Sequence, residues 1–275
     1  MQKLIAHLLI SFAMLAPLSG NAGAKSIPPG LTWNWDLEGG IPGGADIIDY
    51  DPKLGSGNKS RIQRNGARIV ICYFSAGSWE NGRPDMGGLR SGIDYKNPLK
   101  GGNEGGQWKA NGQPERWVNI DSPAVRSVMV GRLVDAKERG CDAVEPDNLD
   151  GDLSQDNASG FEKSPSQVLA YYRFLADEAH KLGLSIGLKN ADDLASTASS
   201  IFDFVIVEEC LQNNECHKYR PFLQKGKAVL IAEYSSSQEL CKKAKSSFQK
   251  DSLNGASITV FPSDRMVKNG RPCRF

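Results

Sequence analysis

Short apolar segments recur along the chain, separated by glycine-rich turns or by segments with helical periodicity. Residues 31–37 alternate strictly, with Leu31, Trp33, Trp35 and Leu37 apolar, which is the period of a half-buried strand. Continuous apolar runs follow, and such runs are typical of strands that a sheet buries on both faces. The further predicted strands cover residues 45–51, 68–74, 141–146, 184–190, 202–210, 227–234 and 256–262.

Helical segments are predicted between several of these strands. Residues 122–140 and 164–183 each begin with Ser-Pro, an N-cap residue followed by a residue suited to the first helical position, and each ends on glycine. Gln167 gives the second segment the spacing of a capping box. Shorter helices are predicted at residues 59–65, 191–200, 219–224 and 238–248.

Eight short strands alternating with helices or loops predict an α/β protein with a (β/α)8 TIM-barrel fold in a single domain. A doubly wound open sheet is the alternative, but no strand leads into a G-x-G-x-x-G or phosphate-loop turn. Residues 77–121 form a glycine-rich insertion after the third strand, too long for an ordinary loop. Several of its residues suit a sugar-binding rim, although a packed insertion explains them equally well: Trp79, Glu80, Arg83, Asp85, Trp108 and Trp117.

The first 24 residues have the plan of a secretory signal peptide. Lys3 precedes an apolar stretch, and Ala22-Gly23-Ala24 supplies the small residues of a cleavage site. Cleavage near Ala24 would leave 251 of the 275 residues, 25–275, as the barrel domain of a secreted, extracellular protein. Later apolar segments are too short for a bilayer, so we expect no membrane span after the signal is removed.

Charge is balanced, with 33 Lys and Arg against 32 Asp and Glu and a formal net charge of +1. A balanced chain without a basic run argues against a nucleic-acid partner. The cysteines and histidines do not have the spacing of a zinc site. We therefore expect neither a metal nor another cofactor, and we expect a monomer.

Six cysteines in an exported chain indicate disulfides. Cys210 and Cys216 enclose a short polar loop that a bond between them would close. Cys241 lies on a predicted helix and Cys273 in the C-terminal tail, so this pair would attach the tail to the body. The remaining two lie inside apolar strands, where buried free cysteines are as good an interpretation as a bridge: Cys72 and Cys141.

Polar and aromatic residues gather at the carboxyl ends of the predicted strands, where (β/α)8 barrels have their active sites. The densest group is residues 141–151, CDAVEPDNLDG, in which a strand runs into a turn crowded with carboxylates. An acidic loop or a Ca²⁺ site is the alternative interpretation, but the spacing is not that of an EF-hand loop. We expect the following residues to line one pocket: Trp35, Asp49, Tyr73, Glu145, Asp147, Asn148, Asp150, Lys189, Asn190, Glu208, Glu209 and Tyr234.

Two carboxylates on different strands of one pocket can cleave a glycosidic bond. One protonates the leaving oxygen, and the other attacks the anomeric carbon or activates water. Asp147 on the fourth strand and Glu208 on the sixth are the best pair, while a nucleophilic triad or a cofactor-bound Lys189 lacks the accompanying motifs. Glu209 competes with Glu208, but neighbours on a strand point to opposite faces.

Five segments together resemble glycoside hydrolase family 114: residues 70–85, 140–151, 183–190, 202–210 and 226–234, with E-P-D-N-x-D-G and E-E-C as their most distinctive motifs. The resemblance runs from about Trp33 to Phe261. It implies a secreted endo-α-1,4-polygalactosaminidase with a TIM barrel, acting with retention on galactosamine polymers that are partly N-acetylated or free. It places the family's carboxylates on Asp147, as nucleophile, and on Glu208, as general acid/base.

The other pocket residues are then candidate contacts for this polysaccharide. Asp49 and Glu145 would pair with the ammonium group of free galactosamine, and aromatic faces would stack on the sugar ring. A structural hydrogen bond or ion pair in the barrel mouth explains each of them equally well. Three other functions stay open, namely a secreted polysaccharide-binding barrel without turnover, a Ca²⁺-stabilised surface protein that uses the acidic turn around Asp147, and a hydrolase of another amino-sugar polymer.

Overall fold

A computed structural model describes residues 24–53, 64–99, 109–110, 113–151, 153, 158–235, 239–262 and 270–274. The predicted (β/α)8 barrel is confirmed, since eight parallel strands pair with their neighbours in chain order. These strands are β1 (Trp33–Asp36), β2 (Ile47–Tyr50), β3 (Ile69–Ser75), β9 (Ala143–Asp147), β10 (Ser185–Lys189), β11 (Phe204–Glu208), β12 (Val229–Tyr234) and β13 (Ser257–Phe261).

The barrel closes between its last and first strands through side chains. The hydroxyls of Ser257 and Thr259 on β13 donate to the carbonyl oxygens of Leu31 and Trp33, each at 2.6 Å. The outer edge of β13 pairs with the short antiparallel strand β14 (Arg271–Pro272), which the sequence did not predict. Hydrogen bonds from hydroxyl side chains thus take the place of a backbone ladder between β13 and β1.

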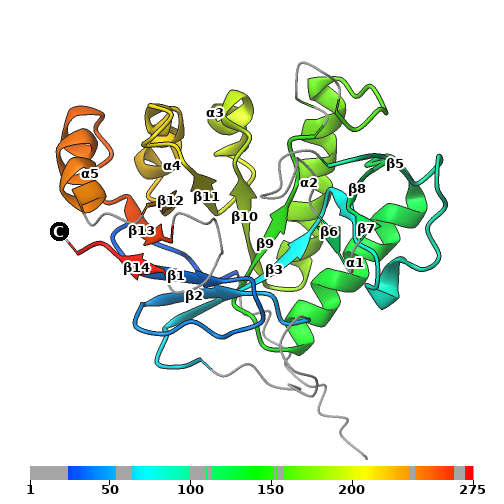
Figure 1. The fold of residues 1–275 in the computed structure, drawn as a ribbon, viewed down its shortest axis with the longest axis horizontal. Helices are drawn as coiled ribbons and strands as arrows, with labels where there is room; N and C mark the ends of the chain where they lie inside the picture. Colours follow the sequence, from blue (N-terminus) through cyan, green and yellow to red (C-terminus); the bar gives the residue numbers. More distant parts are fainter. Residues whose placement is uncertain are drawn as a thin grey trace, which may run out of the picture.

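Helices cover the outside of the barrel unevenly (Figure 1). They are α1 (Pro123–Glu138), α2 (Pro165–Lys181), α3 (Ala195–Ala198), α4 (Arg220–Gln224) and α5 (Glu239–Lys250). The caps read from the sequence are present, because Ser122 accepts from the amide of Val125 and Ser164 forms a capping box with Gln167. Residues 37–46 join β1 to β2 without a helix, and most of the helix predicted at 59–65 lies outside the described residues. None of the described helices could cross a bilayer.

Side chains of the barrel strands alternate between the interior and the surrounding helices. On β3, Ile69 and Ile71 belong to the inner apolar cluster, whereas Val70 and Cys72 belong to the outer one. The next inward position is Tyr73. The inward positions of two other strands change from apolar to polar in the same way. On β9 they are Ala143, Glu145 and Asp147, and on β11 they are Phe204, Ile206 and Glu208. The same alternation therefore supplies the apolar side chains of the barrel interior and the polar side chains at its mouth.

The insertion after β3 is structured in its described part. Strands β4 (Ser78–Trp79), β8 (Arg116–Val118) and β5 (Tyr95–Pro98) form a small antiparallel sheet, and β6 (Lys109–Ala110) pairs with β7 (Gln113–Pro114). A 3-10 helix, η1 (Pro84–Met86), lies between β4 and β5.

A buried ion network ties the insertion to the barrel. Arg83 pairs with Glu80 at 2.8 Å and with Asp51 beyond β2, while Arg132 of α1 pairs with Asp85 at 2.8 Å. Trp79 stacks on Tyr95 with ring centroids 4.6 Å apart. These side chains of the predicted sugar-binding rim therefore have structural partners, and Trp108 lies outside the described residues.

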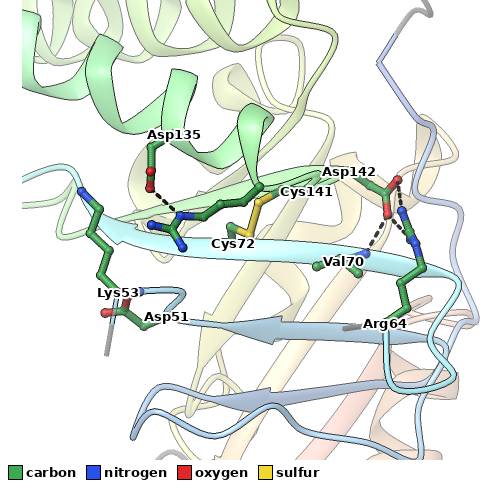
Figure 2. Close-up of a disulfide and its surroundings, with 9 residues drawn as sticks. Asp51, Lys53, Arg64, Val70, Cys72, Asp135, Cys141 and Asp142 are labelled. Carbon is green, nitrogen blue, oxygen red and sulfur yellow. Dashed lines mark hydrogen bonds and ion pairs between the residues drawn. A yellow bond between two sulfur atoms is a disulfide. The ribbon is translucent and has the colours of Figure 1, made fainter. Parts of the chain in front are cut away.

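All six cysteines are paired: Cys72–Cys141, Cys210–Cys216 and Cys241–Cys273. Figure 2 shows the first bond, which the sequence left open, joining β3 to the residue two positions before β9. Beside it, Asp142 pairs with Arg64 at 2.6 Å and accepts the amide of Val70 at 2.9 Å. This carboxylate of the acidic stretch thus lies at the amino end of β9, away from the barrel mouth.

We expect loss of the Cys72–Cys141 bond to destabilise the protein more than loss of Cys210–Cys216, because the entropy that a disulfide removes from the unfolded chain grows with the enclosed loop. The sequence separations are 69 and 6 residues. They correspond to about 4 and about 2 kcal/mol. Urea unfolding of C72A/C141A and C210A/C216A would measure both losses, and equal values would contradict a loop-length origin.

Candidate active site

Three consecutive strands end on charged residues that contact one another at the barrel mouth. Lys189, the last residue of β10, places its Nζ 3.0 Å from Asp147 Oδ1, at the end of β9, and 2.9 Å from Glu208 Oε2, at the end of β11. The side chains of Asp147 and Glu208 are 18% and 27% exposed, against 4% for Lys189. A ligand entering the mouth therefore reaches the two carboxylates before it reaches the ammonium.

A tyrosine on each flanking strand holds the other oxygen of each carboxylate. Tyr73 of β3 donates to Asp147 Oδ2 at 3.2 Å, and Tyr234 of β12 donates to Glu208 Oε1. Five neighbouring strands thus present Tyr, Asp, Lys, Glu and Tyr in order, with Lys189 at the centre. Both carboxylates have one oxygen on the ammonium and one on a phenol, so their orientations are fixed without substrate.

A second carboxylate pair lies below Lys189. Asp49 and Glu145 are fully buried, and none of their oxygens receives a hydrogen bond from a protein donor. Burial raises the pKa of Asp49 to about 7, and burial together with the nearby Asp49 raises the pKa of Glu145 well above its usual value. Two such groups in contact are best satisfied by a shared proton.

Some residues of the pocket predicted from the sequence therefore lie too deep for a ligand to reach. Trp35 is 1% exposed, packs against Trp33, and has its ring centroid 4.9 Å from Lys189 Nζ. With Asp49 and Glu145 fully buried and Lys189 enclosed, these four residues form the floor of the site. Their burial favours a supporting role over the predicted direct contact with the sugar.

The main chain also fixes Asp147. Its carbonyl oxygen accepts the amides of Ala76 and Gly77 at 2.8 and 3.1 Å. A Cβ atom on Gly77 would come within 1.5 Å of the carbonyl oxygen of Asn148, so only glycine allows this approach. The Asn148 side chain donates to Ser75 Oγ at 2.9 Å, which gives this predicted sugar contact a structural bond as well.

The chain turns sharply directly after the charged residue that ends each of the three strands. The residues that follow are all in the left-handed region: Asn148 (φ 59°), Asn190 (φ 50°) and Glu209 (φ 56°). Asn190 uses its side-chain oxygen to accept the amide of Glu208 at 3.0 Å, and so braces the next strand. Of the two adjacent glutamates, Glu208 is the one that reaches Lys189 and Tyr234.

Opposing influences set the ionisation of Glu208. Burial raises its pKa, but the charge of Lys189 and the hydrogen bonds from Tyr234 and Lys189 outweigh burial and bring the pKa below its usual value. This direction favours the carboxylate form. Asp150, half-buried nearby, shows the reverse, because burial and the charge of Asp147 raise its pKa.

The Ca²⁺ interpretation of the acidic stretch is disfavoured, because the ammonium of Lys189 already supplies a cation beside Asp147. Within the part of the chain that the structure describes, the group with metal-ligand proximity is Cys210, Cys216 and Glu233. Its two cysteines are bonded to each other, which removes them as thiolate ligands.

Comparisons with known proteins point to glycoside hydrolases. A sequence model of glycoside-hydrolase family GH114 matches residues 16–262, whereas the comparison with curated proteins gave no match. Ega3 of Aspergillus fumigatus, solved in complex with galactosamine, is similar with a TM-score of 0.71 and 31% identity, over 91% of this chain and 98% of Ega3. The glycoside hydrolase domain of PelA from Pseudomonas aeruginosa shares the fold, with a TM-score of 0.57 and 12% identity over 87% and 97%.

We expect the substitution Tyr234→Phe to raise the pKa of Glu208, because it removes a hydroxyl that donates to the ionised carboxylate. A titration of ¹³C-labelled glutamate carboxyls by NMR would measure the change. Tyr73→Phe is the matched control, since its hydroxyl binds Asp147 instead. An unchanged Glu208 titration in Tyr234→Phe would show that the phenol does not stabilise the carboxylate.

Proposed function

The chain belongs to glycoside-hydrolase family GH114, and on this premise we propose that it is a secreted, retaining hydrolase that cleaves internal α-1,4 bonds of a galactosamine polymer. The observation that carries the proposal is the pair of reachable carboxylates, Asp147 and Glu208, held on either side of one ammonium at the mouth of the barrel. Asp147 acts as the nucleophile and Glu208 as the general acid/base.

The mechanism has two steps. Asp147 attacks the anomeric carbon while Glu208 donates its proton to the oxygen of the leaving chain, which gives a glycosyl ester on Asp147. Glu208, now a carboxylate, then takes a proton from water as that water attacks the same carbon and releases Asp147. The hydroxyls of Tyr73 and Tyr234 orient the two carboxylates for these roles.

The spacing of the carboxylates supports retention. Oxygens of Asp147 and Glu208 lie 3.0 and 2.9 Å from the same nitrogen, so they are separated by no more than the sum of these distances. Inverting enzymes need roughly 6.5–9.5 Å between the carboxyl groups to admit a water, whereas retaining enzymes have roughly 5–5.5 Å. For the two oxygens that contact Lys189, this upper limit lies below the inverting range, which supports retention.

The charge of the rim supports a polymer with free amino groups. Five carboxylates follow the ends of β9, β10 and β11: Asp150, Asp192, Asp193, Glu209 and Glu215. Lys218 pairs with three of them, Asp192, Asp193 and Glu215, so one cation faces three acids in this described part of the rim. Unacetylated galactosamine units are cations, so such a rim attracts them. Galactosamine is also the ligand seen in Ega3.

Secretion is supported by two independent features. Residues 1–24 have the pattern of a signal peptide, and almost all of them lie outside the described residues. The three disulfides suit a protein that functions in an oxidising environment.

We expect the purified protein to release reducing ends from an α-1,4-linked galactosamine polymer, and to give oligosaccharides rather than only monosaccharide. Asp147→Asn and Glu208→Gln should each lower the rate by about 10²–10⁴-fold, since each removes a group that reacts. Glu209→Gln is the matched control for the second variant and should retain most of kcat.

Melting temperatures of all three variants would separate loss of chemistry from loss of fold. No release from the polymer, whether free or acetylated, would contradict the substrate assignment. Binding of the polymer without release would favour a polysaccharide-binding barrel. A collapse in Glu209→Gln together with an active Glu208→Gln would move the acid/base role to Glu209.

Retention predicts that the first product carries the α configuration at its new reducing end. Proton NMR of the anomeric region during the first minutes of hydrolysis would detect this anomer before mutarotation. Prompt appearance of the β anomer would mean inversion, with Asp147 acting as a base toward water.

A further inference from the structure

The ammonium of Lys189 contacts both proposed reacting carboxylates at the same time. Its Nζ lies 3.0 Å from Asp147 Oδ1 and 2.9 Å from Glu208 Oε2. The opposite oxygens of the two carboxylates accept hydrogen bonds from Tyr73 and Tyr234. Each carboxylate is therefore bound to the ammonium in the same way, through one inner oxygen.

A retaining cycle moves one negative charge between these two carboxylates. In the first step the bond between Asp147 and the anomeric carbon forms, the glycosidic bond breaks, and the proton of Glu208 goes to the leaving oxygen. Asp147 becomes a neutral ester as Glu208 becomes an anion. In the second step Glu208 takes a proton from the attacking water, and the electron pair of the breaking ester bond returns to Asp147. In the reacting form, in which Glu208 enters the first step protonated, the pair thus carries a single negative charge before, between and after the steps.

We propose that Lys189 is a positioning residue that serves as the stationary counter-ion of this charge, in contact with whichever carboxylate is ionised. The inference rests on the proposed function. Because one oxygen of each carboxylate lies within hydrogen-bond distance of Lys189 Nζ, the negative charge can pass from one carboxylate to the other without movement of the ammonium. A charge stabilised by groups that are already in place needs no reorganisation in either transition state.

The surroundings of Lys189 hold it in this position. Glu145 lies below it, with Oε1 3.7 Å from Nζ, and Asp49 lies behind Glu145. The ring of Trp35 closes another side, with its centroid 4.9 Å from Nζ. The buried carboxyl pair keeps negative charge beneath the ammonium, so Lys189 stays protonated when either upper carboxylate becomes neutral.

The competing role for Lys189 is direct recognition of the sugar. Burial argues against it, since 3% of the residue is exposed and three carboxylates already surround its Nζ. The two roles predict different kinetics. A lost sugar contact raises KM, whereas a lost counter-ion changes kcat and the ionisation of Glu208.

The test compares wild type with Lys189→Met, which keeps the length of the side chain and removes its charge. We expect kcat to fall by about 10²-fold or more, because charge stabilisation is lost in both steps. We also expect the descending limb of kcat/KM, which reports the deprotonation of Glu208, to move upward by about 1–3 pH units, as Glu208 loses a cation in direct contact. Groups facing Glu208 from the other strands, Asp147, Tyr234 and Asn190, stay in place in this variant.

Lys227→Met is the matched control. Lys227 is a half-buried lysine at the amino end of β12, where it donates to the carbonyl oxygens of Ser199 and Phe202. The loss of its charge should leave the descending limb of kcat/KM at the same pH as in the wild type. An unmoved limb in a folded Lys189→Met protein would overturn the proposal, and so would a raised KM with unchanged kcat.

Two further measurements keep the inference testable on its own. The NMR titration of Glu208 needs no substrate, so an upward shift in Lys189→Met tests the shared charge even if the polymer is not hydrolysed. If Lys189→Met does not fold, Lys189→Met/Glu145→Gln removes one acid together with the cation and restores the charge balance. An unshifted Glu208 in that folded double variant would also overturn the proposal.

Discussion

A buried ammonium ion is the constraint on which the arrangement of the barrel mouth depends. Taking an unpaired cation out of water costs several kcal/mol, so the strands on either side of Lys189 have to supply anions. They do so with their last residues, Asp147 and Glu208, and the next strands outward supply tyrosines to the remaining oxygens. One enclosed charge thereby determines the orientation of the groups on five neighbouring strands.

The same strand alternation produces both the stability and the chemistry of the barrel. Inward positions near the amino ends are apolar and interlock tightly; at Gly187, for example, the ring of Phe204 occupies the space that a side chain would need. Two residues further along β10, the inward position is Lys189. Because outward positions pack separately against the helices, the inner face can become polar toward the mouth without a cost to the outer core.

The barrel and the polar strand ends that meet at its mouth were predictable, because periodicity and cap residues are local properties of the sequence. Depth was not. A sequence locates Asp49 and Tyr73 at strand ends alike, but the stagger between strands of a barrel decides that Asp49 is enclosed and Tyr73 reaches Asp147. The Cys72–Cys141 bond was left open for a related reason, since two cysteines in apolar strands meet only if the strands are neighbours in the right register.

The left-handed residues after β9, β10 and β11 separate two parts of the protein that natural variation can treat independently. Up to Asp147, Lys189 and Glu208 the backbone belongs to the barrel, and beyond them the chain turns out of the mouth into connections that carry the acidic rim. Beyond Asn148 and Asn190, whose side chains bind the strand ends, a connection can therefore lengthen, shorten or change its charge without moving the charged groups at the mouth. The polymer that a descendant of this chain accepts can diverge while the bond-breaking machinery is inherited unaltered.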